Sequence, residues 1–225
     1  MVAARSLGAV SCATGLCAAT EASPAGGYPS VVTLTPRGRS TTSVAVATYQ
    51  QLSQISCPSA NLCVVSDTAG EVHVSTNPTV PHPAWSGVQI GTAPQCDKYN
   101  CNYDPILTVS CASEHLCVAS DANDLWVSTH PAGGAASWIK SALPGKAITA
   151  TSCPSDSTCV AVSAQTAYTT FDPTDRVPQW KSMPLPPITL PSPRGRVPMQ
   201  ISSLSCPTTH ACVAVDGVAS LLSAT

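Results

Sequence analysis

The sequence is poor in charge, in aromatic residues and in long apolar runs. Only 10% of its 225 residues are charged, the formal net charge is −2, and 4% of residues are aromatic. So weak a charge provides no electrostatic footprint for nucleic acid or for an anionic membrane surface. No apolar run reaches the roughly 18 residues that a transmembrane helix needs. Partners of these classes, and a membrane span, are therefore not expected.

Helical periodicity of useful length is absent, and so are several motifs that carry chemistry. The chain contains no Gly-x-Ser-x-Gly, no His-Glu-x-x-His and no phosphate-binding glycine loop. Its only glutamates are Glu21, Glu71 and Glu114, so the paired carboxylates of glycoside hydrolysis have no evident candidates. The sequence therefore provides no catalytic residue and no sign of a cofactor, and we do not favour an enzyme.

What the sequence does contain is a repeated motif. A serine and a cysteine are followed, after four or five residues, by a second cysteine and a short apolar run; the serines are Ser11, Ser56, Ser110, Ser152 and Ser205. The first cysteines are separated by 45, 54, 42 and 53 residues, a period typical of repeat architectures. A tryptophan recurs 21 or 22 residues after the second cysteine, at Trp85, Trp138 and Trp180. The landmarks recur in register, which indicates one repetitive unit.

The twelve cysteines form six close pairs, which predict local disulfides. The usual spacing of five intervening residues is wider than the two to four of zinc ligands, so we expect no metal. The expected pairs are Cys12 with Cys17, Cys57 with Cys63, Cys96 with Cys101, Cys111 with Cys117, Cys153 with Cys159, and Cys206 with Cys212. Each bridge is worth about 2.4 kcal/mol in the chain-entropy model. Disulfides persist in oxidising compartments, so we expect a secreted or cell-surface location.

Residues 1–22 admit two interpretations. Arg5, followed by an alanine-rich stretch, resembles a weak signal peptide. However, Cys12 and Cys17 match the later repeats, and the stretch is poor in leucine, isoleucine and phenylalanine. We favour a first repeat. The chain then shows no export signal although its disulfides require export, so we interpret it as a fragment or one domain of a longer secreted protein.

Each repeat is predicted to form four strands. In the second repeat these are residues 52–57, 62–66, 71–76 and 85–90. A four-stranded meander of this size cannot bury two apolar faces alone, but copies stacked around an axis can. We therefore predict an all-β fold, a single β-propeller domain of four-stranded antiparallel blades. Its five repeats are residues 8–50, 51–105, 106–147, 148–199 and 200–225, and an incomplete ring is favoured over a closed five-bladed one.

Three turns carry a family resemblance. Ser75-Thr76-Asn77-Pro78, Ser128-Thr129-His130-Pro131 and Thr170-Phe171-Asp172-Pro173 each precede a tryptophan. They resemble degenerate Asp-boxes, the turns between the third and fourth strands of sialidase-like propellers, and the whole repeat resembles repeat propellers of secreted bacterial proteins. The resemblance implies the blade, because in that family the box is mainly a structural turn. A sialidase would also need three converging arginines, a Tyr–Glu pair and an acidic Asp, and the sequence does not supply this set.

The direction of the strands sorts the loops into two faces. The cysteine hairpins and the Asp-box-like turns share one face, whereas the connections between repeats lie on the other. The two long connections are residues 91–105 and 184–199. Irregular long loops on a rigid scaffold usually carry binding. We therefore predict a ligand-binding face there, with simple cover of a blade edge as the alternative for the first connection.

The candidate binding residues come from these two connections. Tyr99 and Tyr103 are expected to stack on a sugar or a peptide, with Asp97 and Asp104 beside them. Calcium binding through Asp97, Asn100, Asn102 and Asp104 suits the donor type but lacks the spacing and the glycine of an EF-hand. Arg194 and Arg196, in a proline-rich stretch expected to follow an extended polyproline-like path, would meet a carboxylate or a sulfate.

Aspartates recur at the end of the second strand of three repeats, at Asp67, Asp121 and Asp216. They favour a turn over a ring lining a ligand site. The expected function is an extracytoplasmic binding or scaffolding domain with a glycan or protein ligand, accompanied by further blades or domains outside this chain. The alternatives are a sialidase-like or other glycoside-acting enzyme, and a purely structural array.

Overall fold

The computed structural model describes residues 6–22, 28–44, 50–98, 100–141, 143, 148–163, 165–175, 177–185, 189–192, 195–198, 201–216 and 221–224. Its regular structure is β apart from one 3-10 turn, η1 (Ala135–Ser137). The strands form four four-stranded sheets, one three-stranded sheet and two two-stranded hairpins. Within the described residues, no helix is long and apolar enough to cross a membrane.

The five larger sheets are the blades, and each keeps its strands in chain order. Blade 1 comprises β1 (Leu7–Ala13), β2 (Leu16–Glu21), β3 (Ser30–Thr35) and β4 (Gly38–Ser43). Blade 2 comprises β5 (Leu52–Ser59), β6 (Leu62–Asp67), β7 (Glu71–Ser75) and β8 (Ser86–Gln89). Blade 3 comprises β11 (Thr108–Ser113), β12 (Leu116–Ser120), β13 (Leu125–Ser128) and β14 (Trp138–Ser141). Blade 4 comprises β15 (Ala150–Ser155), β16 (Thr158–Val162), β17 (Thr166–Thr170) and β18 (Lys181–Pro184), and blade 5 comprises β21 (Ile201–Thr208), β22 (Ala211–Asp216) and β23 (Leu221–Ala224).

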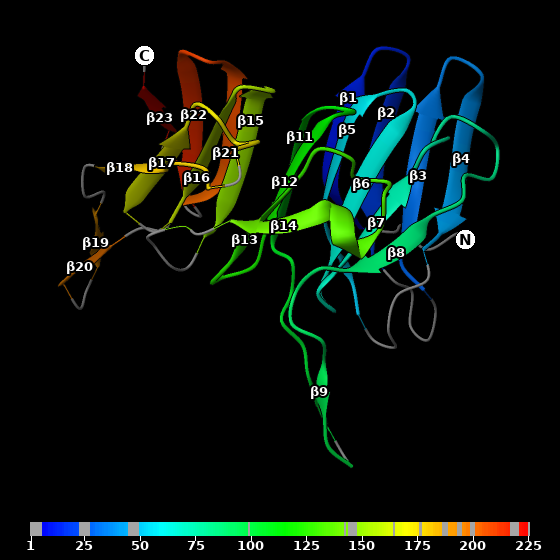
Figure 1. Ribbon diagram of the computed structural model, residues 1–225, viewed down its shortest axis with the longest axis horizontal. Helices are drawn as coiled ribbons and strands as arrows, with labels where there is room; N and C mark the ends of the chain where they lie inside the picture. Colours follow the sequence, from blue (N-terminus) through cyan, green and yellow to red (C-terminus); the bar gives the residue numbers. More distant parts are fainter. Residues whose placement is uncertain are drawn as a thin grey trace.

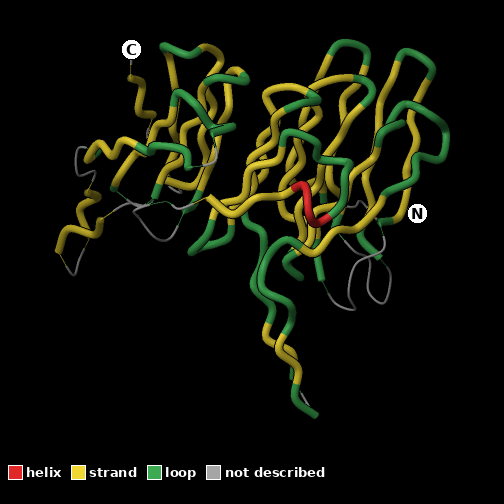
Figure 2. The backbone as a smooth tube through the Cα atoms, viewed as in Figure 1, coloured by secondary structure: helices red, strands yellow, loops and turns green. Residues whose placement is uncertain are grey.

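The blades are arranged as an open array. The first strand of each blade contacts the first strand of the next, in the order β1, β5, β11, β15 and β21. These strands therefore line the axis of the array. Figure 1 shows blades 1 and 5 at opposite ends of the molecule, and the backbone trace of Figure 2 follows the same path. The all-β prediction is confirmed, and the arrangement agrees with an incomplete ring.

The second strand of a blade is buried because neighbours cover both of its faces. On β6, Leu62 and Val64 pack with residues of blade 3, whereas Cys63 and Val65 pack with residues of blade 1. Alternate residues of a strand point to opposite faces, so a continuous run of small and β-branched residues suits this position. We call the face toward the preceding blade the upstream face and the face toward the following blade the downstream face. The recurring tryptophans also lie at these joints. Each belongs to, or packs on, the apolar cluster that joins its blade to the preceding one; they are Trp85, Trp138 and Trp180.

One hydrogen bond repeats at every joint. The hydroxyl of the serine before the first cysteine accepts from the main-chain N–H of the first cysteine of the next blade. The pairs are Ser11 with Cys57 at 2.9 Å, Ser56 with Cys111 at 2.9 Å, Ser110 with Cys153 at 3.0 Å and Ser152 with Cys206 at 3.0 Å. This joint explains why the serine recurs beside the cysteine.

All twelve cysteines are paired as the spacing predicts, and the described residues contain no free cysteine. Five bridges close the hairpin between the first two strands of a blade. The Cys12–Cys17 bridge joins β1 to β2, so residues 7–21 belong to a blade, as the first-repeat interpretation predicts.

The long connections are more regular than expected. The first contains the hairpin β9 (Gln95–Cys96) and β10 (Cys101–Asn102), and the second contains β19 (Thr189–Ser192) and β20 (Gly195–Pro198). The expected polyproline-like path is therefore wrong, because Thr189 pairs with Pro198 and Ser192 pairs with Gly195. A two-stranded hairpin tolerates proline, since each strand is an edge with N–H positions that need no partner strand.

Candidate functional site

The most prominent feature of the predicted binding face is the first connection, residues 91–105, which we call the arm. Figure 1 shows it projecting from the blades on the side opposite the cysteine hairpins. Its tip is closed by the Cys96–Cys101 disulfide. Within that ring, Asp97 N donates to Asn100 O at 2.8 Å, and Asp97 Oδ1 accepts from Asn100 N at 2.6 Å. The tip is thus a short loop held by one covalent bond and two hydrogen bonds.

The base of the arm is fixed to the turn between β6 and β7. Gly70 O accepts from Gly91 N at 3.0 Å and from Gln89 Nε2 at 2.9 Å. The other leg is held by Ile106 N, which donates to Asp67 O at 3.0 Å. Both legs therefore bond to one four-residue turn.

Gly70 is required by this close approach. Its φ is +91°, in the region that favours glycine. A Cβ at this position would lie 2.6 Å from Gln89 Nε2, 3.0 Å from Asp104 O and 3.4 Å from Thr92 O. Thr92 and Asp104 belong to opposite legs of the arm, so Gly70 lies between them.

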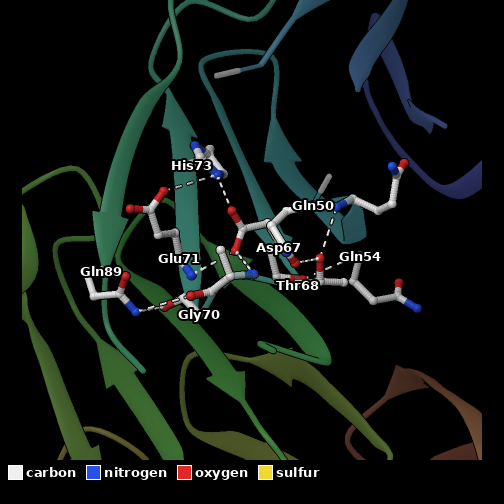
Figure 3. A network of polar contacts seen from close by, with 11 residues as sticks. Gln50, Gln54, Asp67, Thr68, Gly70, Glu71, His73 and Gln89 are labelled. Carbon is white, nitrogen blue, oxygen red and sulfur yellow. Dashed lines mark hydrogen bonds and ion pairs between the residues drawn. The ribbon is translucent and has the colours of Figure 1, made fainter. Parts of the chain in front are cut away.

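A buried polar network holds the turn itself (Figure 3). Asp67 is fully buried, and its Oδ1 accepts from Ala69 N and Glu71 N, both at 2.8 Å. Its Oδ2 lies 2.9 Å from Nε2 of His73, which is also buried. The second carboxylate, Glu71, places Oε2 at 3.7 Å from the same nitrogen. Each oxygen of Asp67 therefore has a partner, and the predicted turn role of this aspartate agrees with the structure.

The network also determines the charge balance of the turn. The pKa of Glu71 is raised above its usual value. Burial is the largest cause, the nearby Asp67 carboxylate adds to the rise, and attraction by His73 opposes it. Asp67, Glu71 and His73 are the one cluster among the described residues whose donor atoms lie close enough to hold a metal ion. Because both oxygens of Asp67 already accept hydrogen bonds, we interpret the cluster as a brace for the arm.

Blade 3 repeats the turn without the histidine. Asp121 Oδ1 accepts from Asn123 N and Asp124 N, both at 2.6 Å. Trp126 pairs with Ala119 just as His73 pairs with Val65, so the tryptophan takes the histidine's place. Asp121 is fully buried and its Oδ2 lacks a hydrogen-bond partner in the described structure. Burial consequently raises the pKa of Asp121 to about 6; its two main-chain hydrogen bonds oppose this rise, and the nearby carboxylates of Asp104 and Asp124 add to it.

The structure separates the predicted binding residues. Asp97 is exposed at the tip of the arm, whereas Tyr103 and Asp104 are half-buried at its base. Tyr99, Arg194 and the side chain of Arg196 lie outside the described residues, although the Arg196 backbone belongs to β20. Figure 1 shows β19 and β20 beside blade 4, away from the arm. The two long connections therefore do not form one continuous site.

Hollows also lie elsewhere among the described residues of the array. A small cavity of about 50 Å³ near the axis is lined by hydroxyl and amide side chains from blades 2 to 5, including Gln54, Thr108, Thr151 and Ser202. Two larger grooves lie at equivalent positions, each between the outer strands of one blade and the turn before the fourth strand of the next. The groove of about 460 Å³ includes Arg37, Arg39 and His82, and the groove of about 420 Å³ includes Lys140 and Asp175.

Sequence reasoning missed His73 and the basic groove. His73 had a usable signal, because it is a polar residue at the strand position where blades 3 and 4 carry Trp126 and Tyr168. Arg37 and Arg39 echo the Arg-Gly-Arg of the second long connection. Only the packing of blade 2 against blade 1 reveals that these arginines line a groove.

The fold resembles solved structures of low sequence identity. YCF48 from Cyanidioschyzon merolae is 12% identical with a TM-score of 0.61, and the match covers 96% of this chain and 67% of that one. YCF48 bound to D1 peptide is 13% identical with a TM-score of 0.59, covering 98% and 63%. A chain of the mitotic checkpoint complex is 8% identical with a TM-score of 0.63, covering 94% and 57%. The fold is that of a β-propeller.

These likenesses establish the fold alone. The chain spans between 57% and 67% of the length of these three structures. A scan against family models finds no match, and a search of curated proteins finds none either.

Proposed function

We propose that this propeller is an extracytoplasmic binding or scaffolding module that holds a peptide segment of a protein partner against the arm. The arm carries the proposal, because it protrudes from the blades and is fixed at both legs and at the tip. A loop that is already ordered loses little conformational entropy when it binds. Rigid scaffolds with protruding loops are a common way of presenting a binding surface.

Further observations support the proposal. Six disulfides favour an oxidising compartment. One structure that the fold resembles is described as bound to a peptide, which is a property of that protein and motivates a peptide as the first ligand to test here. Tyr103 supplies an aromatic surface at the base of the arm, and Asp97 and Asp104 supply carboxylates for basic side chains of a peptide. The resemblance to Asp-boxes concerns only the turns before the fourth strands, and the proposed binding does not depend on it.

The test is retention of the purified chain on an array of overlapping peptides, with a glycan array in parallel. A variant in which Gly-Gly replaces residues 92–104 should keep the β-sheet circular dichroism and lose retention. Point variants of the remaining candidates, Tyr99, Tyr103, Arg194 and Arg196, then locate the contact. Thr14→Ala, in the exposed cysteine hairpin of the opposite face, is the control. Unchanged retention by the armless variant would contradict the proposal, and retention on glycans alone would replace the peptide by a sugar.

A further inference from the structure

The joint between neighbouring blades occurs four times. It therefore shows which kind of surface would cover a blade face that has no neighbour in this chain. Every joint combines the Ser–Cys hydrogen bond with apolar residues of the first and second strands. At the joint of blades 1 and 2, Ile55 and Cys57 are 5% and 4% exposed. At the next joint Val109 is 7% exposed. The upstream face of a blade is therefore built to be covered.

Blade 1 presents this same face to solvent. Val10 holds the position of Ile55, two residues before the first cysteine, and is 68% exposed. Leu7 is 58% exposed on the same strand, and Cys12 is exposed whereas Cys57 is buried. A cluster of exposed large apolar side chains of this kind marks an interaction surface.

Blade 5 presents the complementary face. Val215 holds the position of Val162, three residues after the second cysteine; Val162 is 2% exposed at the covered joint of blades 4 and 5, whereas Val215 is only partly buried. Val213, on the same side of the strand, is also partly buried. Ser205, the fifth copy of the joint serine, is exposed, whereas the other four serines are partly buried and accept from a cysteine N–H.

We infer that the upstream face of blade 1 docks on the downstream face of blade 5 of a second copy of this chain. The occupant follows from continuity with the four internal joints. In this arrangement Ser205 Oγ of one copy accepts from the Cys12 N–H of the next copy, and Val213 and Val215 pack against Leu7 and Val10. The contact is head to tail, because the two surfaces differ.

A head-to-tail contact has a consequence that distinguishes it from nonspecific association. It is heterologous, so assembly extends to further copies or closes into a ring. A chain in which a substitution disrupts the blade 1 face can still dock through its blade 5 face, and the reverse also holds. Two chains spoiled on opposite faces therefore retain one matching joint and form one 1:1 complex.

The experiment is size-exclusion chromatography with light scattering, over a range of concentrations, on the oxidised chain. The wild type should reach at least twice the 22.9 kDa of one chain as concentration rises. Val10→Asp and Val213→Asp should each be monomeric alone, and an equimolar mixture should form a heterodimer and nothing larger. Ile139→Asp, at a residue that is 58% exposed on the outer strand β14, is the matched control and should assemble like the wild type.

Three outcomes would overturn the inference: a monomeric wild type at every concentration, assembly that survives either substitution, or a mixture that stays monomeric. If either variant fails to fold, hydrogen exchange on the wild type replaces it. The main-chain amides of residues 10–13 should exchange several-fold more slowly in concentrated than in dilute protein, while those of Thr35, Arg37 and Gly38 do not change. Equal exchange of residues 10–13 at both concentrations would also overturn the inference.

Discussion

Asp67 and Asp121 hold the same position in neighbouring blades, yet only Asp67 has a partner for its second carboxylate oxygen. His73 lies 2.9 Å from Asp67 Oδ2, whereas Asp121 Oδ2 has no hydrogen-bond partner among the described residues. The difference follows from one substitution and one deletion. Trp126 replaces the histidine, and the turn of blade 3 is one residue shorter. The two turns therefore stabilise the molecule in different ways.

The pair in blade 2 should contribute strongly to stability. His73→Phe keeps a ring of similar shape but leaves the buried Asp67 carboxylate without its partner, which we expect to lower the free energy of unfolding by about 3 kcal/mol. Urea unfolding at neutral pH measures this change. His115→Phe, in an exposed hairpin, should have little effect, and equal losses in both variants would show that the pair is not the cause.

The lone aspartate of blade 3 should make stability depend on pH in the reverse of the usual direction for a carboxylate. Its pKa is raised from 3.8 to about 6, so the folded chain binds a proton that the unfolded chain has released. This contribution is fully present below about pH 4 and is lost as pH rises through about 6. In Asp121→Asn the difference in Tm between about pH 5 and about pH 7.5 should shrink. Asp172→Asn, at an exposed turn, should keep the wild-type difference; no shrinkage in Asp121→Asn would exclude a role for this carboxyl.

Two glycines with similar backbone angles provide a matched test of the arm's base. Gly70 and Gly15 have φ of +91° and +79°, but only Gly70 has neighbours within 4 Å of an added Cβ. Gly15→Ala should therefore cost about 1 kcal/mol of backbone strain, and Gly70→Ala should cost more. Limited proteolysis should cut the arm faster in Gly70→Ala alone. An arm that is cut equally fast in both variants would contradict the fixed base.

The repeated joint allows the same substitution to be made with and without its partner. Ser110→Ala removes the acceptor for Cys153 N–H and should lower the free energy of unfolding by about 1 kcal/mol. Ser205→Ala, measured at a dilution where the chain is monomeric, should leave it unchanged. Thermal unfolding of both variants decides the matter, and a loss at Ser205 as large as that at Ser110 would show that the hydroxyl acts within its own blade.

Much of the fold can be predicted from the sequence because the same strand and turn pattern recurs in every repeat. The second strand of blade 2, predicted at residues 62–66, is Leu62–Asp67, and the third, predicted at 71–76, is Glu71–Ser75. The cysteines fix the register at one end of each hairpin. The patterns also sort the loops into two faces correctly, since that sorting depends only on alternating strand direction.

The features outside the repeat were harder to predict. The arm's hairpin is only two residues long on each side, too short for a periodic pattern. The contact between Asp67 and His73 depends on which face of β7 the histidine occupies. The raised pKa of Asp121 depends on a turn that is shorter by one residue. These features belong to single positions in one blade, so a pattern shared by all the repeats does not reveal them.

The joint between blades also bears on how such an array can grow. Its hydrogen bond uses a serine hydroxyl and a main-chain N–H, and every residue except proline has that N–H. A duplicated blade could therefore fit beside any of its relatives while the rest of its sequence diverges. Unequal recombination at the serine codons would lengthen or shorten the array without the need to design a new interface, and each new copy would bring fresh loops on which a different specificity could develop.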